Sequence, residues 1–215
     1  MRSVAVSLAC VLFAACAPVV GEPADVAELL RDVKQVVAPG ALVGPVAVFG
    51  DQAFTVMTGR SGKQRLAMIG AARYGRGRIV LGGHEGLYGN QQIADQAALV
   101  RNTVAWLAGG KAGARVLLHG HAGFEPTLTR AGFKVTRVTT GQLPGVLSQG
   151  DVLLAAGAQL DKASQGTIDV IAKWIENGGG YFDAVPIWGW MQVTGNDQAA
   201  AYGSNRVTAR AGLML

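Results

Sequence analysis

The sequence of 215 residues contains little cysteine and little charge. Its two cysteines, Cys10 and Cys16, both lie near the N-terminus, so the rest of the chain has neither a disulfide nor a thiol nucleophile. Charged residues make up 15% and hydrophobic residues 50%, a balance that favours a packed core over a disordered chain. The formal net charge is +5, but the basic residues are scattered singly. We therefore predict a globular protein without thiol chemistry and without a nucleic-acid partner.

The N-terminal segment is typical of an export signal. Arg2 precedes an uncharged apolar stretch, residues 4–15, which is too short to cross a bilayer as a stable helix. Small residues then precede Cys16, an order that resembles a bacterial lipobox, in which the cysteine is lipidated through its sulfur. We therefore predict that residues 1–21 are a signal peptide with lipobox and linker. The mature protein would be exported and lipid-anchored through Cys16 at the bacterial cell envelope, in the periplasm or on the surface.

The remaining chain divides into an N-terminal helix, residues 22–43, and one α/β domain, residues 44–215. The helix is predicted by apolar residues at helical spacing as far as Pro39. The domain begins with short apolar runs separated by glycine and charged residues, which predict strands. Turn residues at 49–52 and 74–77 predict β-hairpins in this first part of the domain.

Helical and strand patterns alternate in the second half of the chain. The predicted helices are 93–107, 126–131 and a long helix capped by Asp161 and stopped at Asn177. The predicted strands are 115–119, 134–138, 151–156 and 181–185. Strands separated by helices favour a parallel sheet that is covered on both faces. We therefore predict an α/β fold with a doubly wound, largely parallel sheet of flavodoxin-like type and an N-terminal β-hairpin region.

Several motifs carry a resemblance to known families. Residues 71–80, followed by the His-Glu-Gly turn at 84–86, resemble a hairpin and turn in the N-terminal part of the channel-associated factor family and of bacterial enhancin-like metallopeptidases. Residues 151–154, the long helix and the segment 178–182 are similar to the glutamine-amidotransferase-like domain of those proteins. The resemblance implies a class I glutamine-amidotransferase-like fold for residues 44–215.

The catalytic groups of these families are absent from the sequence. Glutamine amidotransferases of this class place a cysteine nucleophile at a sharp strand-to-helix turn, and no cysteine follows Cys16. No His-Glu-x-x-His motif occurs, so the zinc peptidase domain of the enhancin-like proteins is not present in this sequence. We therefore predict a protein that is not an enzyme and needs no cofactor, an exported binding or accessory module for a glycan or a protein partner.

Five residues are candidates for ligand binding. Trp188 and Trp190 could stack on a sugar ring or on an aromatic side chain of a partner; alternatively, one fills the core and the other covers the sheet edge. Asp183 lies near the position where the family's nucleophile would sit and could act as an acid or base. His84 and Glu85 close another predicted strand at what should be the ligand-binding edge of the sheet.

A metal site is the main alternative. His119 and His121 end a predicted strand, where alternate residues face the same side. Together with His84 and a carboxylate they would suit zinc, which leaves a metal-assisted hydrolase with Glu85 or Asp183 as base as the alternative function. The same histidines are also typical of solvated or locally hydrogen-bonded loop residues. A third hypothesis is a purely structural envelope lipoprotein without a ligand.

Overall fold

The computed structural model describes residues 23–61, 63–89 and 94–215. The signal peptide predicted at residues 1–21, with its lipidation site Cys16, lies outside these residues. Within the described ranges, every helix is too short or too polar to cross a membrane.

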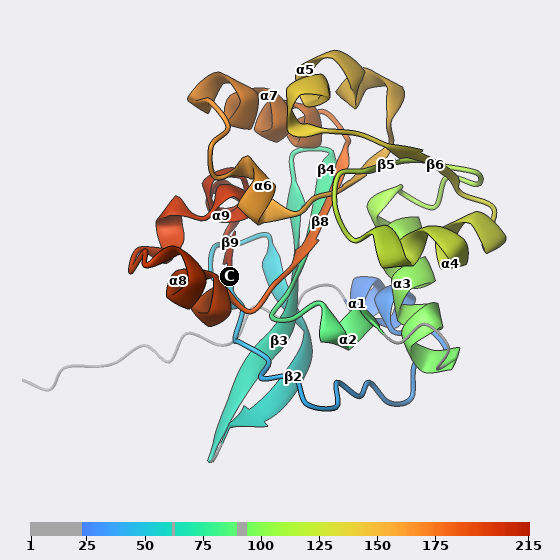
Figure 1. Ribbon diagram of the computed structural model, residues 1–215. Helices are drawn as coiled ribbons and strands as arrows, with labels where there is room; N and C mark the ends of the chain where they lie inside the picture. Colours follow the sequence, from blue (N-terminus) through green and yellow to red (C-terminus); the bar gives the residue numbers. More distant parts are fainter. Residues whose placement is uncertain (1–22, 62, 90–93) are drawn as a thin grey trace, which may run out of the picture.

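A seven-stranded mixed sheet forms the centre of the domain (Figure 1). Its strands lie in the order β2-β3-β4-β8-β7-β5-β6. Their bounds are β2 Ala53–Ser61, β3 Gln64–Tyr74, β4 Gly77–Gly82, β5 Arg115–Leu118, β6 Lys134–Arg137, β7 Val152–Leu154 and β8 Gly180–Ala184. The pairs β2–β3 and β3–β4 are antiparallel, whereas all pairs from β4 to β6 are parallel. The predicted α/β class with a mostly parallel sheet is therefore confirmed, and the strand order is compatible with a flavodoxin-like fold.

Helices cover both faces of this sheet (Figure 1). Their bounds are α1 Pro23–Leu29, α2 Gly86–Gly89, α3 Ala94–Leu107, α4 Glu125–Arg130, α5 Leu143–Val146, α6 Gly157–Leu160, α7 Gln165–Glu176, α8 Ile187–Thr194 and α9 Gly203–Thr208. Helices α1, α3 and α4 pack on one face, and α5, α7 and α9 pack on the other. Because neighbouring strand residues point to opposite faces, Phe182 joins the first core cluster and Tyr181 the second.

One of the two predicted hairpins is present. The turn after β3 joins it to β4, with Gly75 at a φ of 59°, which glycine adopts without strain. The hairpin predicted at 49–52 is wrong, because β1 (Ala47–Val48) pairs with β9 (Leu213–Met214) and not with β2. A backbone bond from Phe49 N–H to the carbonyl of Gly212, 2.8 Å, continues this pairing. Contact between the two ends of the domain overrides the local turn signal.

The N-terminal helix is shorter than predicted. Helix α1 ends at Leu29, and Asp32 adopts a left-handed φ of 60° that directs the chain away from the helix axis. The following backbone is held by Asp95, whose Oδ2 accepts hydrogen bonds from the N–H groups of Lys34 and Gln35, at 3.1 and 2.8 Å. Val33 and Val36 still pack against the core, so the apolar pattern reports burial correctly but not the helical conformation.

The long helix α7 has a different N-cap from the one predicted. Ser164 caps it by accepting a hydrogen bond from the N–H of Thr167 at 3.1 Å. Asp161 instead accepts hydrogen bonds from the Gly203 N–H, 2.8 Å, and from Trp190 Nε1, 2.7 Å. Its carboxylate therefore connects α6 to α8 and α9. The predicted stop is confirmed, with Asn177 at the C-cap.

Candidate functional site at the carboxyl edge of the sheet

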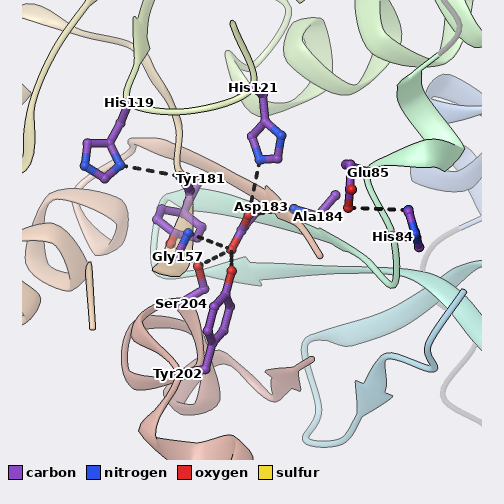
Figure 2. Close-up of polar contacts among 11 residues, drawn as sticks. His84, Glu85, His119, His121, Gly157, Tyr181, Asp183, Ala184, Tyr202 and Ser204 are labelled. Carbon is purple, nitrogen blue, oxygen red and sulfur yellow. Dashed lines mark hydrogen bonds and ion pairs between the residues drawn. The ribbon is translucent and has the colours of Figure 1, made fainter. Parts of the chain in front are cut away.

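The loops that follow three parallel strands meet at the carboxyl edge of the sheet (Figure 2). β5 lies between β6 and β7, so the chain leaves β5 towards one side and returns past it to form β7. In open α/β sheets such a reversal of strand order is the usual place for a ligand. Here it brings His121, which follows β5, and Gly157, which follows β7, to Asp183 on β8.

Asp183 is the centre of this arrangement, and its side chain is only 1% exposed. Five groups donate hydrogen bonds to the carboxylate. Oδ2 accepts from Gly157 N (3.1 Å), Tyr202 Oη (2.8 Å) and Ser204 Oγ (2.5 Å), and Oδ1 accepts from His121 Nε2 (3.1 Å) and Ala184 N (2.8 Å). A carboxylate offers about four lone-pair sites. Its accepting capacity is therefore filled by the protein itself.

Two buried tyrosines complete the network. The hydroxyl of Tyr181 lies 2.6 Å from Ser204 Oγ and donates to it, because Ser204 gives its own proton to Asp183. Burial, and then the nearby negative charge of Asp183, raise the pKa of Tyr181 and of Tyr202 far above the usual value. Both phenols therefore stay protonated and act as hydrogen-bond donors.

His121 is held firmly beside Asp183. Its backbone has a left-handed φ of 55°, which is uncommon outside glycine. Its ring stacks on Phe124, with centroids 5.3 Å apart and planes 13° apart, and meets Phe182 edge-on at 5.2 Å. The left-handed turn lets Nε2 reach Asp183 at the sheet edge.

His119 does not share a site with His121, contrary to the prediction from strand alternation. β5 ends at Leu118, so the alternation does not extend to these residues. His119 Nε2 lies 2.9 Å from Thr140 Oγ1, while Nδ1 accepts a bond from the Ala156 N–H at 3.4 Å. Burial lowers the pKa of His119, an effect that the charge of Asp183 opposes and that of His121 reinforces. The imidazole is therefore neutral, with its proton on Nε2.

His84 and Glu85 make a local contact of their own (Figure 2). His84 Nδ1 accepts a hydrogen bond from the Gly86 N–H at 2.8 Å, so it has no proton to share with Glu85 Oε2, 3.4 Å away. No group of three or more His, Cys, Asp or Glu side chains close enough to hold a metal ion occurs in the described part of the chain. The residues of the zinc hypothesis are therefore divided between separate contacts, His121 with Asp183 at 3.1 Å and His84 with Glu85 at 3.4 Å.

The two tryptophans lie on α8 but do not form one surface. Residues two apart on a helix point in nearly opposite directions. Trp190 is 8% exposed, donates to Asp161 Oδ2 and packs against Tyr202 at 5.3 Å. Trp188 is 38% exposed, and its Nε1 donates to the carbonyl of Leu42 at 2.9 Å. Of the pair, only Trp188 is accessible to a ligand.

Sequence reasoning missed four members of the Asp183 network: Gly157, Tyr181, Tyr202 and Ser204. No motif or spacing links them, because Tyr202 and Ser204 reach Asp183 from α9, which the sequence pattern did not predict. One signal was present in the glycines. A Cβ on Gly203 would lie 2.3 Å from the carbonyl oxygen of Gly157, so both glycines mark the close approach of α6 and α9.

An open groove of about 440 Å³ lies between the segment before β1 and the β2–β3 hairpin. Most of its lining is apolar and includes two methionines; the full lining is Val36, Ala38, Ala41, Leu42, Val43, Met57, Thr58, Gly59, Arg60, Met68 and Leu87. Leu42 also contacts Trp188 through its carbonyl, which places the exposed tryptophan beside the groove. We call this lining set the apolar groove.

Comparison with known proteins identifies the family. The family described as "TRPM8, N-terminal domain" (TCAF_N) matches residues 19–215. A TRPM8 channel-associated factor homolog from Danio rerio is 26% identical over 82% of this chain and 18% of its own length. TRPM8 channel-associated factor 1 from Homo sapiens is 28% identical over 57% of this chain and 12% of its own length. The chain spans less than a fifth of the length of these relatives.

Solved structures show the same fold. The IMPa metallopeptidase from Pseudomonas aeruginosa superposes with a TM-score of 0.64 at 17% identity, over 88% of this chain and 21% of that chain. IMPa in complex with an O-glycopeptide gives a TM-score of 0.63 at 16% identity, again over 88% and 21%. The resemblance to channel-associated factors and to this type of metallopeptidase is therefore confirmed, while the amidotransferase-like character stays a prediction.

The predicted localisation is contradicted. The sequence relatives are channel-associated factors from animals, including Danio rerio, Rattus norvegicus and Homo sapiens. They point away from a bacterial lipid-anchored envelope protein. The match over residues 19–215 is the finding that identifies the molecule: the chain belongs to the TCAF_N family.

Proposed function

We propose that this member of the TCAF_N family is a non-catalytic binding or accessory module that docks a protein partner at the apolar groove. The main observation that supports the proposal is that the protein's own donors use up the hydrogen-bond-accepting capacity of the Asp183 carboxylate. It occupies the place where an α/β protein of this topology would hold its ligand, yet it is buried and accepts five hydrogen bonds from the chain itself.

The geometry at the carboxyl edge disfavours acid–base or nucleophilic chemistry. A general base needs a free lone pair within reach of its substrate, and Asp183 has neither a free lone pair nor access. Ser204 is fully buried and its oxygen also accepts the Tyr181 hydroxyl, so it has no access to a substrate as a nucleophile. His121 is stacked against Phe124 and bonded to Asp183. These groups hold β5, β7, β8 and α9 together.

The apolar groove has the features of a protein-docking surface. Met57 is partly buried at the groove and has a flexible, polarisable side chain that adapts to the shape of a partner, while Met68 is buried beneath it. Leu42 is 71% exposed and Trp188 is partly exposed beside it, and buried aromatic contacts often dominate the affinity of an interface. The names of the sequence relatives as channel-associated factors support a protein as the partner.

A glycan remains the second partner class. Two of the similar solved structures are of IMPa with an O-glycopeptide and with T-antigen. Since this chain covers only 21% of the IMPa chain, those complexes support glycan binding here only by analogy. The one side chain of the candidate tryptophan pair that could stack on a sugar is Trp188.

The proposal is tested by comparing two matched substitutions. Leu42→Asp places a charge in the apolar groove, and Val193→Asp places the same charge on an 88% exposed valine that does not line it. Partners cross-linked to the wild-type domain in cell extracts are purified and titrated against each variant by calorimetry. We expect Leu42→Asp to weaken binding at least about tenfold, because a charge cannot be buried unpaired, and Val193→Asp to leave it unchanged.

Three results would contradict the proposal. One is equal binding of the purified partner to wild type and Leu42→Asp. Another is a domain that binds T-antigen in a Trp188-dependent way and binds no protein through the apolar groove, which would favour the glycan function. The third is a hydrolytic activity that disappears in Asp183→Asn while the fold remains intact, which would overturn the non-catalytic assignment.

A further inference from the structure

A second groove, of about 420 Å³, lies over β5 and β6 at the opposite end of the strand order, between these strands and the segment 142–149. We propose that it binds an acidic, extended peptide segment of a partner protein, which adds to the sheet as a strand next to β6. The lining residues are Arg115, Leu117, Lys134, Thr136, Arg137, Val138, Gln142, Val146 and Gln149, and we call this set the basic groove. It shares no residue with the apolar groove, so its test does not depend on the proposed function.

The backbone of β6 has hydrogen-bonding groups available for another strand. Among the described residues, β6 is the last strand of the sheet and pairs with β5 alone. The Lys134 N–H bonds to the carbonyl of Ala114 at 3.0 Å, and the Val138 N–H bonds to the carbonyl of Leu118 at 3.1 Å. Because alternate residues of a strand direct their backbone groups to opposite sides, Val135 and Arg137 direct theirs away from β5. An extended peptide pairs with just such groups.

The charge of the basic groove selects an acidic ligand. Three lining residues are basic and none is acidic. Arg115 is paired with Asp151 at 3.3 Å and Arg137 with Glu125 at 2.5 Å. Lys134 is exposed and makes no ion pair within the described residues, so it can pair with a carboxylate of the ligand. A positive charge on the ligand would instead be repelled by Lys134.

The register of β5 and β6 defines where the ligand's side chains would lie. Lys134 lies opposite Arg115, and Thr136 lies opposite Leu117. Lys134 and Arg115 therefore form the basic end of the groove. Two residues further along the strands, Thr136 and Leu117 begin a floor that continues to Val138 and Val146. Since alternate residues of the added strand face the same side, a ligand that runs parallel to β6 should carry acidic residues first and apolar residues next, at every second position.

Exposed lysines also protect edge strands from unwanted pairing. Protection by charge explains Lys134, but it requires no groove beside the strand. The combination of free backbone groups, a basic end and an apolar floor is what a peptide-binding edge needs, with backbone bonds for affinity and side-chain contacts for specificity.

The test uses a fluorescein-labelled peptide, Gly-Glu-Ser-Glu-Ser-Val-Ser-Val-Gly, and the same peptide with Lys in place of Glu. Fluorescence anisotropy with the wild-type chain should give a dissociation constant of about 100 µM or tighter for the acidic peptide and at least about tenfold weaker binding for the basic one. Lys134→Glu should weaken binding of the acidic peptide about tenfold. The matched control Lys63→Glu makes the same charge change on the β2–β3 hairpin and should have little effect.

A second pair of variants tests strand addition itself. Val135→Pro removes an outward N–H from an edge strand, a position where proline is tolerated. It should weaken binding about tenfold, whereas Val135→Ala keeps the N–H and should bind as wild type does. Unfolding midpoints of all variants are measured in parallel, so that loss of binding is compared only among folded proteins.

Three outcomes would overturn the inference. Wild type could fail to bind the acidic peptide at 1 mM, or bind both peptides equally. Alternatively, Val135→Pro could bind normally while chondroitin sulfate competes with the peptide, which would make the groove a general polyanion site and not a strand-addition site.

Discussion

Substitution of Asp183 by Asn is the sharpest test of the filled-carboxylate argument. The amide has the same shape as the carboxylate but keeps only one acceptor oxygen. The new NH₂ group faces three donors, from Gly157, Tyr202 and Ser204, if it replaces Oδ2, and two donors, from His121 and the Ala184 N–H, if it replaces Oδ1. The substitution thus exchanges an acceptor for a donor at the most crowded point of the network.

The size of the stability loss depends on which of those donors can rotate away from the new NH₂ group. The hydroxyls of Tyr202 and Ser204 can rotate, but the backbone N–H groups of Gly157 and Ala184 cannot, so either orientation of the amide leaves one backbone donor without an acceptor. One buried donor left without a partner costs about 1–3 kcal/mol. The loss of the charge from the accepting group adds about 1 kcal/mol, so we expect a total of about 2–4 kcal/mol. For a domain of this size, that lowers the unfolding midpoint by about 4–16 °C.

Thermal and urea unfolding, followed by circular dichroism, measure this loss. Tyr202→Phe is the matched control, because it removes one of the five donors and leaves the carboxylate in place. It should cost only about 1 kcal/mol. A loss below about 0.5 kcal/mol for Asp183→Asn, or a larger loss for Tyr202→Phe than for Asp183→Asn, would refute the view that Asp183 connects the carboxyl edge as a structural acceptor.

Two further predictions concern His119 and the tryptophans. Because burial lowers the pKa of His119, the unfolded chain binds its proton more readily; the stability contributed by neutral His119 should be complete above about pH 6.5 and decline as the pH falls below that value. Urea unfolding between pH 7.5 and 5 should show this decline, and His119→Gln should reduce it; an equal pH slope in both proteins would contradict the assignment. Trp190→Ala should cost about 3–5 kcal/mol because the side chain is buried, whereas Trp188→Ala, at a partly exposed position, should cost clearly less. The urea unfolding midpoints of the two variants measure these losses, and a larger loss for Trp188→Ala than for Trp190→Ala would show that the two burial assignments are wrong.

Local patterns predicted the inner strands β4, β5, β7 and β8 well because these strands are largely buried on both faces. The strands around Val80, Leu117, Leu153 and Phe182 have no solvent-exposed face, so a continuous apolar run is enough to indicate each strand. The same kind of pattern failed before residue 39. There the backbone N–H groups bond to Asp95 on a distant helix, and an extended segment buries valines that also fit a helical spacing.

The candidate site was predicted in part. Asp183 and His121 could be placed at the carboxyl edge from strand ends alone. Their partners could not, because the donors Tyr202 and Ser204 come from α9, whose position depends on packing against α6 and α7. The roles of Trp188 and Trp190 depend in the same way on α8, since a helix separates two side chains that a strand would have placed on one face.

The position of α9 explains why this domain should bind partners at the edges of its sheet. In open α/β sheets, ligands enter the crevice where the strand order reverses. Here Tyr202 and Ser204 supply from within the chain the hydrogen bonds that a ligand would otherwise make to Asp183. The open grooves lie instead at β2–β3 and at β6, the two ends of the strand order. Because they share no lining residue, Leu42→Asp and Lys134→Glu should act independently, each weakening only its own ligand.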